Sequence, residues 1–213
     1  MNKAVKQNKK YSTKWMTGTA LMVAITVVLA FTPLGIIPLV VLSATTLHIP
    51  TIIATLFLGW ESGVICGLVF GITSLIKNFH SASLFAPFFK NPLVSIMPRV
   101  LFPLAVYGIS ILVGRFLKKG KLGENVTYVV SSFLGTLIHT TMVMGMIYLL
   151  YRTRIEAVLQ NGAGVPESIA KNGVGLGIAV MGVTNGLPEA LVAAIIAPIV
   201  LLALNRAFSG RER

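Results

Sequence analysis

The chain has 213 residues, of which 55% are hydrophobic and 11% are charged, and its mean hydropathy is +0.84. A soluble domain carries about 25% charged residues, so this composition excludes an ordinary soluble protein and indicates one that lies in a membrane. The net charge of +12 would be typical of a nucleic-acid-binding protein if the basic residues formed one soluble patch, but here they stand between apolar runs and bear on membrane topology.

Six apolar segments follow one another along the chain, and we expect each of them to form a transmembrane helix. They comprise residues 15–33, 49–59, 63–76, 93–116, 126–151 and 174–204. A bilayer core requires about 20 residues of helix, so the second and third segments reach that length only with their flanks. The predicted fold class is an all-α integral membrane protein, a compact bundle of six transmembrane helices formed by residues 15–205.

The basic residues predict the orientation of this bundle. Twelve of the 18 Lys and Arg residues lie in the amino-terminal segment of residues 1–14, in the connection between the fourth and fifth segments, and in the tail of residues 206–213. With six crossings, all three regions fall on one side of the membrane. The excess of positive charge in cytoplasmic regions then places both termini in the cytoplasm.

Arg99 is the most informative single residue. It lies in the fourth apolar segment, about two turns or ~10 Å from the outer end. An ionisable side chain at that depth is costly, and it typically faces a cavity, a partner or an anionic ligand. A guanidinium also has the shape to bind a carboxylate or a phosphate through two hydrogen bonds.

Several other polar residues lie in the outer half of the predicted bundle. In chain order they are Thr73, Lys77, Asn78, His139, Asn185 and Glu189. The inner halves of the second, third and fourth segments hold almost none, which predicts a pocket open to the outside rather than a channel. Each residue also has a structural interpretation, such as a hydroxyl bonded to its own helix, a packed histidine or a lysine that reaches the headgroups.

Small residues predict two close helix contacts. Ala20 and Ala24 form a small-xxx-small pair in the first segment, and Gly63, Gly67 and Gly71 form a ladder in the third. We expect the glycine ladder to pack inside the chain. The sequence has no G-x-x-x-x-G-K-[ST] motif for ATP hydrolysis and no obvious internal repeat, which suggests a binding subunit that depends on other proteins.

The stretch from His48 to Ser74 reads HIPTIIATLFLGWESGVICGLVFGITS. Together with the six helices and the alanine pair, it resembles the substrate-binding S component of an energy-coupling factor (ECF) vitamin transporter. The patterns H-I-P-x-I-I, L-G-x-x-x-G and G-x-x-F-G-x-T-S, with the later N-P-L-V-S and Pro98-Arg99, resemble the pantothenate branch most.

The resemblance implies a subunit without a cofactor that binds a vitamin from outside and delivers it through a transmembrane T component and two cytoplasmic ATPases. It implies a Gram-positive plasma membrane and assigns Ala20 and Ala24 to docking on the T component. Pantothenate is a small anion with a carboxylate, two hydroxyls and an amide, and we expect Arg99 to bind the carboxylate. The other predicted contacts are Thr73, Asn78, His139 and Asn185 for the hydroxyls and amide, and Phe70 and Tyr107 for the gem-dimethyl group.

Two alternatives remain open at this point. Another vitamin such as folate or riboflavin would require aromatic stacking, and the Phe-rich connection of residues 78–91 offers such side chains. An integral-membrane hydrolase would use His48, His139 or Glu189, and catalysis needs a base and its partner within hydrogen-bond reach. We expect His48 at the outer surface and His139 near the midplane, which disfavours the enzyme.

Overall fold

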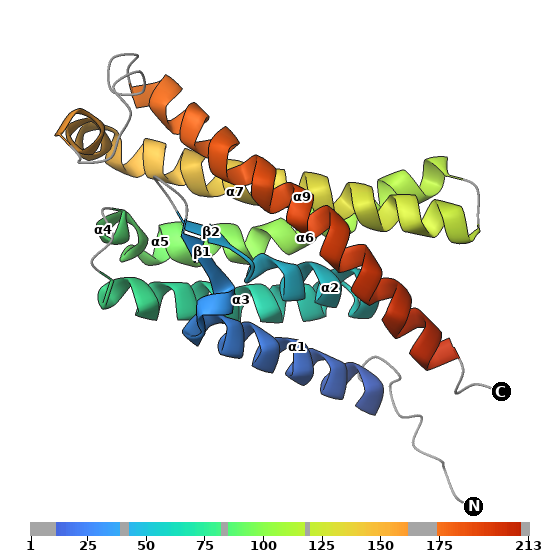
Figure 1. The fold of residues 1–213 in the computed structure, drawn as a ribbon. Coiled ribbons are helices and arrows are strands. Elements are labelled where there is room, and N and C mark those ends of the chain that lie inside the picture. The colour runs from blue at the N-terminus through green and yellow to red at the C-terminus, as the bar shows by residue number, and fades with distance from the viewer. Residues whose placement is uncertain (1–11, 39–42, 82–84, 118–119, 162–173, 210–213) are drawn as a thin grey trace, which may run out of the picture.

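The computed structural model describes residues 12–38, 43–81, 85–117, 120–161 and 174–209, which form a helical bundle with one short two-stranded sheet (Figure 1). The long helices are α1 (Thr13–Phe31), α3 (Trp60–Phe79), α6 (Met97–Phe116), α7 (Lys121–Asn161) and α9 (Val174–Ser209). The shorter elements are η1 (Pro33–Gly35), β1 (Ile36–Pro38), β2 (Ser43–Thr45), α2 (His48–Leu58), α4 (Ala86–Phe89) and α5 (Pro92–Ser95).

All six predicted apolar segments are helical, but only five are long enough to cross a bilayer. In the described part of the chain these are Thr13–Phe31, Trp60–Phe79, Pro92–Phe116, Lys121–Arg154 and Gly175–Ala207. The second segment forms α2, whose 11 residues extend about 17 Å, roughly half the thickness of the hydrocarbon core. A multi-pass helical membrane protein is therefore confirmed, whereas six full crossings are not.

The two ends of α2 explain why it is short. Gly59 ends the helix with φ 101°, a left-handed conformation that favours glycine, and α3 begins at the next residue. Before α2, the chain forms strands β1 and β2, which pair antiparallel with Ile36 opposite Thr45. The backbone N–H of Thr45 donates to the Glu189 Oε1 atom of α9 at 2.6 Å, so the sheet lies against that helix instead of forming a simple surface loop.

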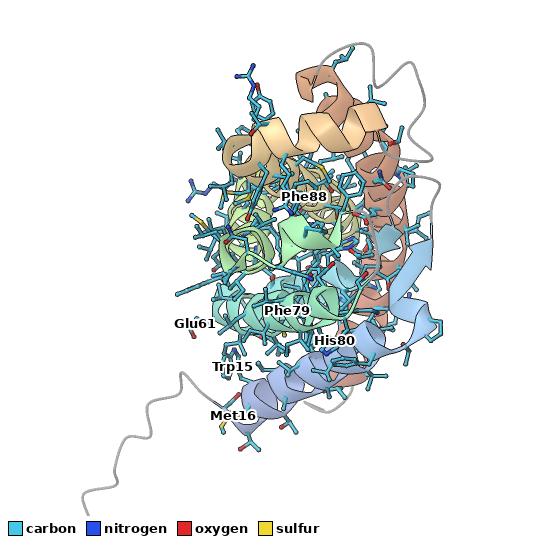
Figure 2. The ribbon with its side chains drawn as sticks, turned by 90° about the vertical axis from the view of Figure 1, so that its left-hand side faces the viewer. Trp15, Met16, Glu61, Phe79, His80 and Phe88 are labelled. Carbon is cyan, nitrogen blue, oxygen red and sulfur yellow. The ribbon has the colours of Figure 1, made fainter. Side chains whose placement is uncertain are left out.

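The helix ends group as the charge pattern predicts. Figure 1 shows the start of α1, the end of α9, the α2–α3 turn, the end of α6 and the start of α7 at one end of the bundle. Trp15 connects the start of α1 to the end of α2, because its Nε1 donates to the Leu58 carbonyl at 3.1 Å. In Figures 1 and 2, α1 lies along one edge of the bundle and α7 along the opposite edge. The cytoplasmic location of the basic end stays a prediction.

Two predicted connections prove to be more ordered than expected. The Phe-rich connection of residues 78–91 contains α4, and Phe85 and Phe88 are buried in a cluster with Val143 and Ile147 of α7. The connection expected at residues 152–172 begins instead as part of α7, which continues to Asn161 past one non-helical residue at Tyr151. Residues 162–173 lie outside the described part of the chain.

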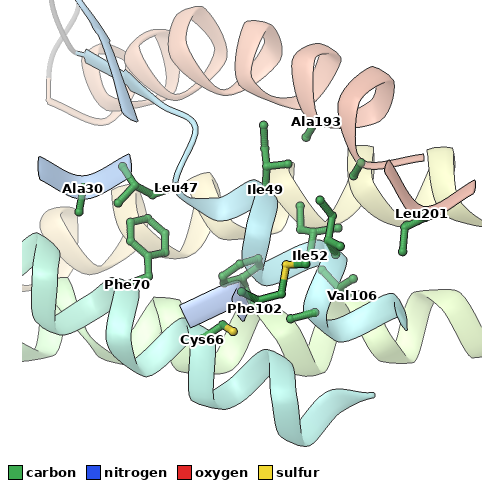
Figure 3. Packing of buried hydrophobic residues seen from close by; sticks show 14 residues of the cluster. Ala30, Leu47, Ile49, Ile52, Cys66, Phe70, Phe102, Val106, Ala193 and Leu201 are labelled. Atoms are coloured by element: carbon green, nitrogen blue, oxygen red, sulfur yellow. The ribbon is translucent and has the colours of Figure 1, made fainter. Parts of the chain in front are cut away.

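The main core joins α1, α2, α3, α6 and α9. Its fully buried members include Ile52, Cys66, Phe102, Val106 and Leu201, whose side chains converge in Figure 3. Burial in a close-packed interior agrees with a structural role for the single cysteine.

The glycine ladder packs inside the chain, as predicted. A Cβ atom on Gly63 would lie 2.0 Å from Thr55 Oγ1, and one on Gly67 would lie 2.0 Å from the Arg99 carbonyl oxygen. One on Gly71 would lie 2.8 Å from the Ile96 Cα atom. Only a missing side chain permits such approaches, so the ladder brings α3 against α2 and α6 and sets the depth of Arg99.

Candidate functional site

Arg99 points into the bundle and not toward lipid headgroups, since its side chain is only 5% exposed. One guanidinium nitrogen, Nη1, donates to the Val94 carbonyl in the preceding turn, whereas Nε has no hydrogen-bond partner among the described residues. The Cζ atom lies 5.4 Å from the ring centre of Phe70 and 5.3 Å from that of Phe89. The cation is therefore held between two aromatic rings and keeps N–H groups for a further partner.

His139 of α7 lies next to this cation in the same aromatic cluster. Its ring centre is 5.8 Å from Phe70 and 4.9 Å from Phe102, and the residue is 4% exposed. Neither ring nitrogen has a hydrogen-bond partner within the described residues. A buried polar group without a partner is costly, so a bound molecule or water that supplies one would be favoured here.

His48 overturns one expectation drawn from the sequence. It is buried, and its ring stacks on His139 with the centres 6.1 Å apart, so the prediction that the two histidines are separate is wrong. The reason is that β1 and β2 carry the chain back along α9 before α2 begins. The His48 ring lies beside the carbonyls of Thr45 and Glu189 but outside hydrogen-bond geometry.

Glu189 adds an acidic side chain to the surroundings of Arg99. The carboxylate is buried, accepts the Thr45 hydrogen bond and lies close enough to Arg99 for the two charges to interact. The site therefore combines an arginine, a glutamate and two histidines within an aromatic surround. Residues 35–47 are almost wholly apolar, and surface loops are normally polar, so the composition of this connection pointed to a contact with the bundle but not to the helix involved.

Two further predicted contacts, Thr73 and Asn78, form hydrogen bonds within their own helix, α3. Thr73 is buried, but its hydroxyl donates to the Val69 and Phe70 carbonyls at 2.9 and 3.0 Å. The amide of Asn78 donates to the Ser74 carbonyl of its own helix at 2.8 Å. The Thr73 bonds match the structural interpretation given above for a hydroxyl bonded to its own helix, and Asn78 is bonded within its helix in the same way.

Asn185 and Tyr107 complete the set of predicted substrate contacts. Asn185 is buried on the same face of α9 as Glu189, and its amide donates to the Thr184 hydroxyl at 3.4 Å. Tyr107 is half-buried and follows Arg99 by eight residues, about 12 Å along α6, which places it well away from the guanidinium. The structure thus brings Arg99, His139 and Phe70 together and adds His48, Glu189, Phe102 and Phe89.

Helix α1 packs against the bundle with one face and leaves the predicted docking residues exposed on the other. Its inner face is buried, and the Thr19 hydroxyl donates to Ser62 of α3 at 2.9 Å. Ala20 and Ala24 lie on the exposed face. Lys77 donates to the Ala30 carbonyl at 2.6 Å, so it ties α3 to the end of α1 and does not extend to the headgroups.

The arrangement suits recognition of a small anion more than metal chemistry. Among the described residues, no three His, Cys, Asp or Glu side chains are grouped so that they could hold a metal ion. The guanidinium and the unpartnered imidazoles instead offer directed hydrogen bonds in a water-poor interior, where such bonds discriminate strongly between ligands.

Comparison with known proteins then identifies the family. The family model for the substrate-specific component of ECF transporters matches residues 14–201. The chain belongs to this family. It is a membrane transport subunit and not an enzyme, which excludes the hydrolase alternative and confirms the resemblance seen in the sequence.

Two similar proteins are informative beyond the family match. The pantothenic acid transporter PanT of Lactococcus lactis subsp. cremoris (strain MG1363) is 27% identical over 180 residues, which cover 76% of this chain and 78% of that protein. The solved structure of ThiT from Listeria monocytogenes shares the fold, with a TM-score of 0.61 over 91% of this chain and 96% of that one at 18% identity.

Proposed function

We propose that this S component binds pantothenate at the outer side of the membrane and delivers it through a T component and two cytoplasmic ATPases. The family match and the similarity to a pantothenic acid transporter support this assignment. The observation that carries it is the burial of Arg99 between Phe70 and Phe89 with hydrogen-bond donors to spare.

The chemistry of the ligand matches the groups at the site. A buried anion needs a paired cation and hydrogen-bond donors, or its desolvation is not compensated. In this proposal Arg99 binds the carboxylate, and the ring nitrogens of His139 serve the hydroxyl and amide groups. Phe70 packs against the gem-dimethyl group. Asn185 is a further polar candidate, while Thr73 and Asn78 would first have to exchange bonds within α3.

Calorimetry on the purified protein tests the central contact. We expect Arg99→Ala to weaken pantothenate binding about a thousandfold or more, because breaking a buried charge contact on one side costs on the order of 3–5 kcal/mol. Arg115→Ala, which removes an exposed arginine at the other end of the same helix, is the matched control and should bind normally. An Arg99→Ala affinity within threefold of wild type would contradict the assignment.

The identity of the vitamin is tested separately. Mass spectrometry of ligand released from the purified protein should find pantothenate, and pantothenate should compete for the site better than folate or riboflavin. Binding of folate or riboflavin without binding of pantothenate would reject the vitamin but leave the family unaffected.

A further inference from the structure

A concave feature outside the Arg99 site lies between α7 and α9. It is an open groove of about 760 Å³, lined by one face of each helix. Its lining includes Thr140, Met144 and Tyr148 from α7 and Ile178, Gly182 and Leu187 from α9. Figure 1 shows α7 and the first half of α9 on the side of the bundle away from α1, which carries the alanine pair, whereas the second half of α9 crosses toward the start of α1.

The glycines show that the groove is a wedge. A Cβ atom on Gly186 would lie 3.0 Å from the Thr140 side chain, so the two helices touch there. At Gly182 the corresponding distance to Met144 is 3.7 Å, and at Gly175 and Gly145 no atom lies within 4 Å. The helices therefore separate toward Tyr148, and small residues leave the widening space unfilled.

A tyrosine and an arginine lie at the wide end of the groove, near the end of the apolar span. Tyr148 lines the groove there, and the Cζ atom of the exposed Arg152 lies 5.7 Å from the Tyr148 ring centre. Arg152 is near the end of the apolar span Lys121–Arg154. Tyrosine rings are enriched at both membrane interfaces, and an arginine at that level lies within reach of lipid phosphates.

We propose that this groove binds an anionic phospholipid, with one acyl chain between α7 and α9 and the phosphate on Arg152. Both helices are apolar enough to cross the bilayer, so hydrocarbon surrounds the groove along its length. The groove is lined by the first part of α9, which lies away from α1, and is thus free of the proposed T component contact. An arginine at the open end favours a negative headgroup over a zwitterionic one.

Lipid retention by the full chain provides the test. The protein is reconstituted in phosphatidylcholine vesicles that contain a minor fraction of phosphatidylglycerol and is then extracted in detergent, and the retained lipid is measured by mass spectrometry. We expect enrichment of phosphatidylglycerol over phosphatidylcholine. Arg152→Gln should weaken phosphatidylglycerol retention about fivefold, whereas Arg115→Gln at the other end of the bundle should have no effect.

A second pair of variants tests the groove itself. Gly182→Leu should fill the space and remove the retained lipid, whereas Gly108→Leu, at an exposed glycine of α6 with no atom within 4 Å, should not. Equal retention of the two lipids by wild type would overturn the proposal, as would full retention by Arg152→Gln. Light scattering that showed a dimer, with Gly182→Leu making it monomeric, would assign the groove to a second copy of the chain and also overturn it.

Discussion

Burial of Arg99 is costly in a membrane, and its neighbours show how the cost is offset. The Val94 carbonyl accepts one hydrogen bond, the rings of Phe70 and Phe89 flank the cation, and the charge of Glu189 acts on it. These contacts leave part of the guanidinium, including Nε, without a hydrogen-bond partner among the described residues. In the proposed function, a carboxylate ligand supplies the remaining hydrogen-bond acceptors.

A substitution at His139 can distinguish a role in ligand binding from a role in packing. His139→Phe keeps a ring of similar size against Phe70 and Phe102 but removes both unpartnered nitrogens. We expect the melting temperature to be maintained or raised, and pantothenate affinity to fall about tenfold to a hundredfold, because lost hydrogen bonds to a bound ligand cost roughly 1–3 kcal/mol. Calorimetry and thermal melting measure the two effects, and unchanged affinity would mean that His139 only packs.

At the scale of elements, the sequence predicted the helices well where a single apolar run determines them. It placed α1, α3, α6, α7 and α9, and the buried positions of Arg99 and His139 follow from their places within such runs. It did not predict the burial of His48 or the bond between Thr45 and Glu189, because both depend on a pairing of β2 with α9 across 144 residues of sequence. Apolar periodicity carries no information about such a distant contact.

The contact between α3 and α6 yields a prediction of its own. A Cβ atom on Gly67 would collide with the Arg99 carbonyl, so Gly67→Ala must push the two helices apart. We expect a loss of roughly 1–3 kcal/mol in stability from overpacking, and weaker pantothenate binding because Arg99 moves. Gly108→Ala is the control, since α6 has open space there and alanine is the better helix former. Equal melting temperatures and affinities for the two variants would contradict this account of how Arg99 is positioned.

At the scale of the whole molecule, the two faces of the bundle differ in what they offer a partner. The α1 face presents Ala20 and Ala24 beside larger exposed residues such as Met16 and Val28, so a second helix can approach its backbone closely. The face formed by α7 and α9 instead holds the groove assigned above to a lipid. In the proposed function, α1 is therefore the surface for the T component, whereas the proposed vitamin site lies among α2, α3, α6, α7 and α9.

Separation of docking from binding can be measured directly. We expect Ala20→Trp and Ala24→Trp to abolish pantothenate uptake in cells that express the T component and both ATPases, because an indole ring prevents close helix approach. The purified variants should still bind pantothenate with wild-type affinity, since both positions lie on the exposed face of α1, which carries none of the proposed site residues. Leu149→Trp, at a 76% exposed position of α7 on the opposite edge, is the matched control and should support normal uptake. Normal uptake by both alanine variants would remove α1 as the docking surface, and loss of vitamin binding would show that this face of α1 supports the fold itself.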